Sequence, residues 1–105
     1  MATQLRHADA LQSQIELWTE RLFEKGYVII PNVVDPALIA AFDSDLAEAF
    51  EKTPFSQGNF YGSRTKRFGR ALTRSRHGST LIQNELVLGI AERALAPWCD
   101  SIQLN

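Results

Sequence analysis

The strongest chemical signal in the chain is a run of basic residues near its middle. Between positions 52 and 84 the sequence has no Asp or Glu, and its Lys and Arg residues are Lys52, Arg64, Lys66, Arg67, Arg70, Arg74 and Arg76. Arginine binds carboxylate and phosphate groups through two parallel N–H donors, whereas lysine binds them as a point charge. Thr65, Lys66 and Arg67 are therefore the best candidates for holding an anionic cosubstrate or substrate. A solvated basic loop without a ligand is the alternative.

Two aromatic residues and one amide are further candidates for binding. Phe60 and Tyr61 lie in the same segment and either wall a substrate pocket or anchor the segment on the core, and we expect the anchoring role. Gln103 lies between Ile102 and Leu104, so in a strand its side chain points to the opposite face from theirs. It either hydrogen-bonds a cosubstrate or is a plain surface residue, and the sequence favours the second interpretation.

The residues that could ligate a metal or act as a nucleophile are badly placed. His7-Ala8-Asp9 matches a His-x-Asp pattern, but it lies at the N-terminus and no third ligand accompanies it. His77, beside Gly78, is expected to be an exposed turn residue. Cys99 is expected to be a small buried apolar residue, because no His or Asp arrangement would activate it. We therefore assign no catalytic residue and no metal ligand.

The composition is that of one small globular domain. The 105 residues are 45% hydrophobic and 22% charged, which excludes collagen-like and wholly disordered chains. No apolar run reaches the roughly 18 residues of a membrane-spanning helix, and we expect no membrane partner. The single cysteine excludes an internal disulfide framework and predicts a reducing, cytoplasmic setting. The pI of about 6.1 and the acidic residues that flank the basic segment argue against a nucleic-acid partner.

Hydrophobic spacing and capping residues predict three main helices. The first covers residues 9–25 and ends at Gly26, the second begins after the cap Asp35 with Pro36 at its first position, and the third follows the cap Asn84 and runs to about residue 94. A short helix is predicted over 71–76. Residues 55–69 fit neither a helical nor a strand period, which is typical of a functional loop.

Two short segments are predicted as strands, which makes the predicted fold class α+β. Tyr27–Ile30 reads as a buried strand, and the alternation over residues 101–105 reads as a half-buried one. Two short strands do not make a stable sheet. We therefore expect the chain to be the N-terminal piece of something larger, or to borrow a sheet from a partner, with self-association through the C-terminal strand as one route.

The ordered set of these motifs resembles the N-terminal part of the phytanoyl-CoA dioxygenase family. The matching stretches are Gly26–Asp35 (GYVIIPNVVD), Gly58–Gly62 (GNFYG), Thr65–Arg67 (TKR), Pro97–Asp100 (PWCD) and Ile102–Leu104 (IQL). Members are Fe(II)- and 2-oxoglutarate-dependent oxygenases on a double-stranded β-helix, or jelly roll. The resemblance implies that residues 1–105 form the mainly helical N-terminal portion of one such domain, with the jelly-roll core missing. It also favours a role for Thr65, Lys66 and Arg67 at the mouth of its active site, with Tyr61 and Gln103 kept as further binding candidates.

The resemblance further implies cofactors whose ligands this sequence does not supply. The family binds iron through His-x-Asp and a distant second His, and a basic residue near that second His holds 2-oxoglutarate. We therefore expect a complete enzyme to use Fe(II), 2-oxoglutarate and dioxygen to hydroxylate a small organic or acyl substrate, with release of succinate and carbon dioxide. The chain alone is expected to be inactive and to bind neither cofactor tightly. The alternative is a small basic-loop module that binds nucleic acid or an acidic partner.

Overall fold

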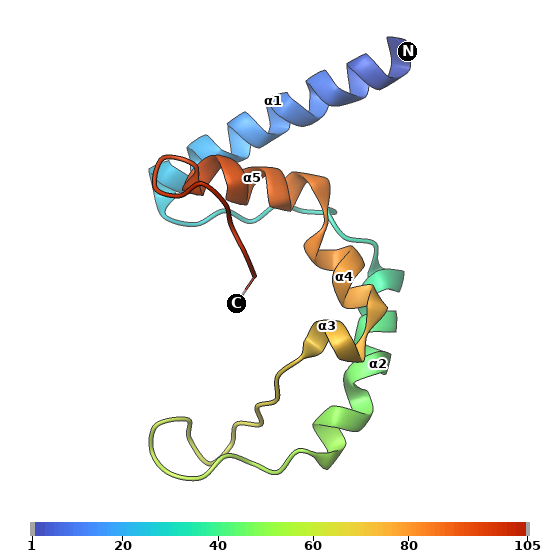
Figure 1. The fold of residues 1–105 in the computed structure, drawn as a ribbon, viewed down its shortest axis with the longest axis vertical. Helices are drawn as coiled ribbons and strands as arrows, with labels where there is room; N and C mark the ends of the chain where they lie inside the picture. Colours follow the sequence, from blue (N-terminus) through green and yellow to red (C-terminus); the bar gives the residue numbers. More distant parts are fainter. Residues whose placement is uncertain (1, 105) are drawn as a thin grey trace. The chain divides into compact units, whose positions relative to one another are not determined.

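Helices account for the regular structure of the chain. The computed structural model describes residues 2–104 (Figure 1). Its helices are α1 (Ala2–Lys25), α2 (Pro36–Lys52), α3 (Ala71–Arg74), α4 (Arg76–Ile82) and α5 (Glu85–Leu95). The chain divides into two compact units. Unit 1 combines Met1–Val33 with Ile82–Asn105, and unit 2 is Val34–Leu81.

The predicted α+β fold class is wrong, because residues 2–104 contain helices and no strand. Tyr27–Ile30 and Ser101–Leu104 have no regular structure, and neither segment makes a backbone–backbone hydrogen bond within the described part of the chain. Tyr27 and Ile29 are 62% and 78% exposed, so the segment is not the buried strand predicted above. The physical reason is that β-prone side chains form a strand only where a neighbouring strand completes the hydrogen-bond ladder.

The helix caps predicted for α2 and α5 are confirmed. Asp35 has an extended backbone and its Oδ1 accepts a hydrogen bond from the Ala37 N–H at 2.9 Å, with Pro36 at the first helical position. α2 ends before Pro54, because a residue that precedes proline avoids helical dihedral angles. The Asn84 side-chain oxygen accepts from two backbone N–H groups in the first turn of α5, each at 3.1 Å.

Other helix boundaries differ from the prediction. α1 begins at Ala2 rather than near residue 9, because the residues before Asp9 include good helix formers such as Gln4, Leu5 and Arg6. The short helix predicted over 71–76 is interrupted at Ser75, whose backbone is extended. A further helix, α4, follows the interruption. Its sequence contains Gly78 and two β-branched residues, so intrinsic propensity gives no strong helical signal there.

Unit 1 is built on the contact between α1 and α5, which run side by side in the same direction (Figure 1). Its buried side chains are Ile15, Thr19 and Ile90. Gly89 lets the two helices approach closely, because a Cβ at this position would overlap the end of the Ile15 side chain. The Thr19 hydroxyl is satisfied inside this contact, since it donates to the Ile15 carbonyl at 2.6 Å.

Unit 2 has a smaller core around α2. Leu46 is its buried apolar side chain, and Ser75 is buried beside it at 4% exposure. Gly78 of α4 packs under the Phe42 ring, where a Cβ would lie 3.0 Å from Phe42 Cε2. Ile39 and Phe50 of α2 are each 45% exposed. Unit 2 therefore buries only part of the apolar face that its sequence offers.

Within residues 2–104, none of the helices combines the length and the apolar character needed to cross a bilayer.

Candidate functional site

Residues 55–70, here called the basic loop, form the connection between α2 and α3 in unit 2. The loop is closed on itself by a hydrogen bond from the Ser56 N–H to the Thr65 carbonyl, at 2.7 Å. Gly58 and Gly62 make the turns between these two residues with φ values of 85° and 82°, a left-handed conformation that glycine adopts at little cost. The loop ends at Arg70, which also has a positive φ and precedes α3.

Lys66 fastens the basic loop to the end of α2. Its Nζ donates to the Phe50 carbonyl at 2.9 Å, and it also lies 5.0 Å from the centre of the Phe55 ring. The Phe50 ring in turn meets the Phe68 ring edge to face, with centroids 4.6 Å apart. Lys66 is half-buried by these contacts, so its ammonium group holds the loop in place as well as contributing charge.

Arg67 presents its guanidinium on the aromatic side of the loop. The Arg67 Cζ lies 4.1 Å from the centre of the Tyr61 ring, a cation–π distance. Tyr61 contacts Phe60 edge to face, with ring centroids 4.8 Å apart. Thr65, the remaining candidate on this loop, is exposed and supplies the carbonyl that closes it. The structure therefore brings Tyr61, Thr65, Lys66 and Arg67 together on one loop.

Phe60 and Tyr61 do not anchor the basic loop on the core. Phe60 is 89% exposed and Tyr61 46% exposed, so the anchoring role predicted for them is wrong. Phe50 and Phe68 make the aromatic contact that joins the loop to α2 instead. The sequence does not distinguish the two pairs, because Phe50 and Phe68 lie far apart in the chain and meet only in the fold.

The charge of the loop is not neutralised by ion pairs. Within the described residues, the four ion pairs involve His7, Lys52, His77 and Arg93, and none of them includes a cation of residues 64–70. The loop thus offers guanidinium N–H groups that are free to bind a carboxylate or phosphate group. α2, on which the loop is fastened, carries Asp43, Asp45, Glu48 and Glu51, so the positive surface is bounded by negative charge.

Gln103 belongs to the other unit. It is exposed in the extended segment that follows α5, and no strand forms there to give it a cavity face. It makes no hydrogen bond to another described residue. Gln103 is therefore part of unit 1, whereas the other four candidates lie on the basic loop of unit 2.

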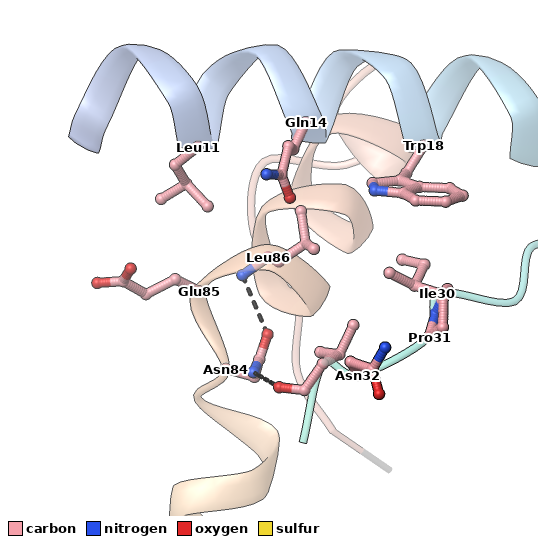
Figure 2. Close-up of a pocket in the computed structure, with 10 residues that line it drawn as sticks. Leu11, Gln14, Trp18, Ile30, Pro31, Asn32, Asn84, Glu85 and Leu86 are labelled. Atoms are coloured by element: carbon pink, nitrogen blue, oxygen red, sulfur yellow. Dashed lines mark hydrogen bonds between the residues drawn. The ribbon is translucent and has the colours of Figure 1, made fainter. Parts of the chain in front are cut away.

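A groove in unit 1 was not foreseen from the sequence (Figure 2). It has a volume of about 430 Å³. Its walls come from α1, from the segment after Ile29 and from the start of α5: Leu11, Gln14, Trp18, Ile30, Pro31, Asn32, Val33, Asn84, Glu85 and Leu86. Asn32 turns the chain at the groove with a φ of 60°, and Asn84 donates to the Val33 carbonyl at 3.3 Å. The lining combines apolar side chains with three neutral amides and the carboxylate of Glu85, and it contains none of the cations that mark the basic loop.

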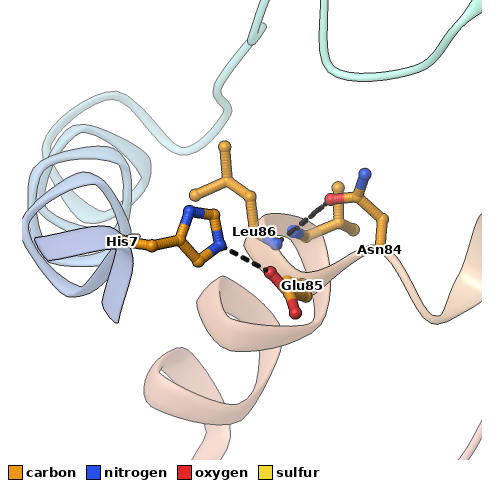
Figure 3. Close-up of polar contacts among 5 residues, drawn as sticks. His7, Asn84, Glu85 and Leu86 are labelled. Atoms are coloured by element: carbon orange, nitrogen blue, oxygen red, sulfur yellow. Dashed lines mark hydrogen bonds and ion pairs between the residues drawn. The ribbon is translucent and has the colours of Figure 1, made fainter. Parts of the chain in front are cut away.

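His7 is used in a contact beside this groove and not in a metal site. Its Nε2 lies 3.4 Å from Glu85 Oε2, as Figure 3 shows. Asp9 is two residues further along the same helix, and residues at this spacing point to different sides of a helix. Within residues 2–104 there is no group of three or more His, Cys, Asp or Glu side chains that could hold a metal ion. The described residues therefore do not fit the iron that the family resemblance implies.

A polar cluster in unit 2 joins α2 to the break between α3 and α4. Asp45 Oδ2 lies 2.7 Å from His77 Nδ1 and accepts a hydrogen bond from the Ser75 hydroxyl at 2.6 Å. Ser75 also accepts from the His77 N–H at 3.1 Å. These hydrogen bonds, from His77 first and then Ser75, hold the pKa of Asp45 below its ordinary value. Serine and histidine share one carboxylate oxygen here and do not bond to each other's side chains, so the cluster is not a nucleophilic triad.

Two sequence expectations are corrected by these placements. His77 is not an exposed turn residue: it lies in α4 with 32% of its side chain exposed, because Asp45 binds its ring. Cys99 is not buried: it is exposed, and its thiol donates to the Leu95 carbonyl at 3.2 Å. The His77 contact comes from a helix 32 residues away in the chain, whereas the Cys99 contact is local.

Comparisons with known proteins give no relative from which a function could be transferred. No family model, no curated protein and no solved structure matches this chain.

Proposed function

We propose that this chain contributes the basic loop to a non-haem Fe(II)- and 2-oxoglutarate-dependent oxygenase of the kind that it resembles, the phytanoyl-CoA dioxygenase family. The complete enzyme hydroxylates a small organic or acyl substrate. In that reaction one oxygen atom of dioxygen enters the substrate and the other enters succinate, while 2-oxoglutarate loses carbon dioxide. The protein acts in the cytoplasm, as its single cysteine suggests.

The observation that carries the proposal is the basic loop with its unneutralised cations. A guanidinium group binds a carboxylate or phosphate group through two parallel hydrogen bonds, and in the proposal the substrate supplies this group. Arg67 is held on the Tyr61 ring and makes no ion pair with a described residue. Its orientation is therefore partly fixed before an anion binds, which lowers the entropy lost on binding.

The iron ligands of the proposed enzyme come from outside residues 2–104, because these residues contain no three-ligand group. The described residues accordingly have one role in the proposal, which is to bind and orient an anionic group. We assign no proton transfer and no redox step to them. The 105-residue chain alone is expected to form no succinate.

The first measurement is the nucleotide sequence of the transcript that encodes the chain. We expect the reading frame to continue past the codon for Asn105 and to encode His-x-Asp followed by a more distant His. The encoded protein, purified and supplied with Fe(II), 2-oxoglutarate and dioxygen, is expected to release succinate. Replacement of the His of that His-x-Asp by Ala is the matched control and abolishes the release.

Either of two results contradicts the proposal. One is a reading frame that ends or continues without such a ligand set. The other is an intact ligand set with no succinate formed by the iron-loaded protein. Stoichiometric succinate formed by the 105-residue chain itself would also contradict the assignment of the iron ligands.

A further inference from the structure

Phe60, Tyr61 and Arg67 form a continuous stack on the exposed side of the basic loop. Phe60 meets Tyr61 edge to face at 4.8 Å between ring centroids, and the Arg67 guanidinium lies 4.1 Å from the centre of the same Tyr61 ring. Tyr61 is therefore the shared neighbour of an open aromatic ring and a cation. The Ser56–Thr65 hydrogen bond closes the segment that carries Phe60 and Tyr61, and Arg67 follows two residues after Thr65.

The two ends of the stack offer different chemistry to a ligand. Phe60 is 89% exposed, so nearly the whole ring surface is open to water. Covering an exposed aromatic surface is favourable, and flat rings stack on one another with an added geometric preference. The guanidinium of Arg67 has one face on Tyr61, while its N–H edge is free of carboxylate partners among the described residues. This edge suits a carboxylate or phosphate group.

The surrounding charges limit the size of the anion. Lys66 ties the loop to the Phe50 carbonyl near the C-terminal end of α2. Glu51 lies in the same part of that helix, whereas the nearby Glu48 is paired with Lys52. A long polyanion that follows the loop would approach Glu51, and like charges repel. A ligand with a single anionic group avoids this repulsion.

We propose that the basic loop binds a small aromatic anion, a flat unsaturated ring that carries one carboxylate or phosphate group, with the ring on Phe60 and the anionic group on Arg67. This inference deepens the proposed function, because it names the class of substrate that the same site would bind. It rests on the proposed function only where it calls the ligand a substrate. The shared chemistry covers both an aromatic carboxylate and an aryl phosphate, so the experiment uses one probe of each kind.

The experiment is a titration of the isotope-labelled full chain, followed through its backbone amide signals by NMR. The probes are benzoate and phenyl phosphate, with acetate and inorganic phosphate as anions that lack the ring and benzyl alcohol as a ring that lacks the charge. We expect benzoate, phenyl phosphate or both to shift the amide signals of residues 58–68. Each ring-bearing probe that binds is expected to bind about 3- to 10-fold more tightly than the anion that lacks the ring.

Two variants separate the contributions of the stack. Phe60→Ala is expected to remove the preference for the ring while weak binding of inorganic phosphate remains. Arg67→Gln is expected to weaken every anion. Phe60 is exposed and Arg67 lies on the surface, so neither change removes buried core. Arg6→Gln, on α1 of unit 1, is the matched control for loss of one positive charge and is expected to have no effect.

Three results overturn the inference. In the first, the ring-bearing and ringless anions bind equally, or no probe shifts the loop signals. In the second, Phe60→Ala leaves the ring preference unchanged. In the third, a short single-stranded oligonucleotide binds more tightly than phenyl phosphate with an affinity that falls steeply with salt, which identifies a polyanion surface. None of these results depends on iron or succinate, so they are distinguishable from a failure of the proposed oxygenase function.

Discussion

The contact between Ile15 and Gly89 gives the sharpest prediction about unit 1. A Cβ on Gly89 would overlap Ile15 Cδ1 and lie 2.9 Å from Ile15 Cγ1. Rotation about χ2 of Ile15 can move Cδ1 away. It cannot move Cγ1, because the χ1 angle of a β-branched residue is nearly fixed in a helix. Gly89→Ala therefore forces α1 and α5 apart by a small distance.

The expected magnitude follows from two opposing effects. Overpacking a close contact costs about 1–3 kcal/mol, and alanine is favoured over glycine inside a helix by about 1 kcal/mol. Gly89→Ala should therefore destabilise unit 1 by a net amount of about 1 kcal/mol. In an Ile15→Ala background both clashing carbons are absent, so there the same change should be neutral or stabilising by up to about 1 kcal/mol.

The assay is urea unfolding followed by tryptophan fluorescence. Trp18 and Trp98 both belong to unit 1, and unit 2 has no tryptophan, so the signal reports unit 1. Gly69→Ala, in unit 2, is the control, since a Cβ there meets nothing within 4 Å. The reasoning is refuted if Gly89→Ala is as stable as the unchanged chain, or if it destabilises equally in both backgrounds.

Two further predictions concern polar groups. The pKa of Asp45 lies below its ordinary value of 3.8, so the stability contributed by its contact with His77 is present above that value and is lost as the pH falls through the lower pKa of the folded state. An acid titration followed by the NMR signals of unit 2 should show this loss, and Asp45→Asn should remove it. An unchanged acid transition in the variant would be inconsistent with the contact. Asn84→Ala removes the acceptor for two backbone N–H groups of α5 and should cost about 1 kcal/mol in the urea assay. Gln83→Ala is its control, and equal midpoints for the two variants would rule out a stabilising cap.

The positive charge of the candidate site can be read from the sequence, but the contacts of its aromatic side chains cannot. The absence of acids from residues 52–84 is a property of the sequence, as is the position of the basic-loop cations on one segment. Which aromatic residues would meet was not predictable. Phe50 and Phe68 lie 18 positions apart and meet only because the loop folds back on α2, whereas Phe60 stays exposed.

The sequence by itself determined the features that depend on near neighbours. Asp35 and Asn84 cap their helices through hydrogen bonds that reach only two or three residues along the chain, so their types and positions are sufficient to predict them. The tertiary structure decided everything that needs a partner distant in sequence. It joined Asp45 to His77 and Ile15 to Gly89, and it left Tyr27–Ile30 unpaired, because β-prone residues cannot supply the second strand that a ladder requires.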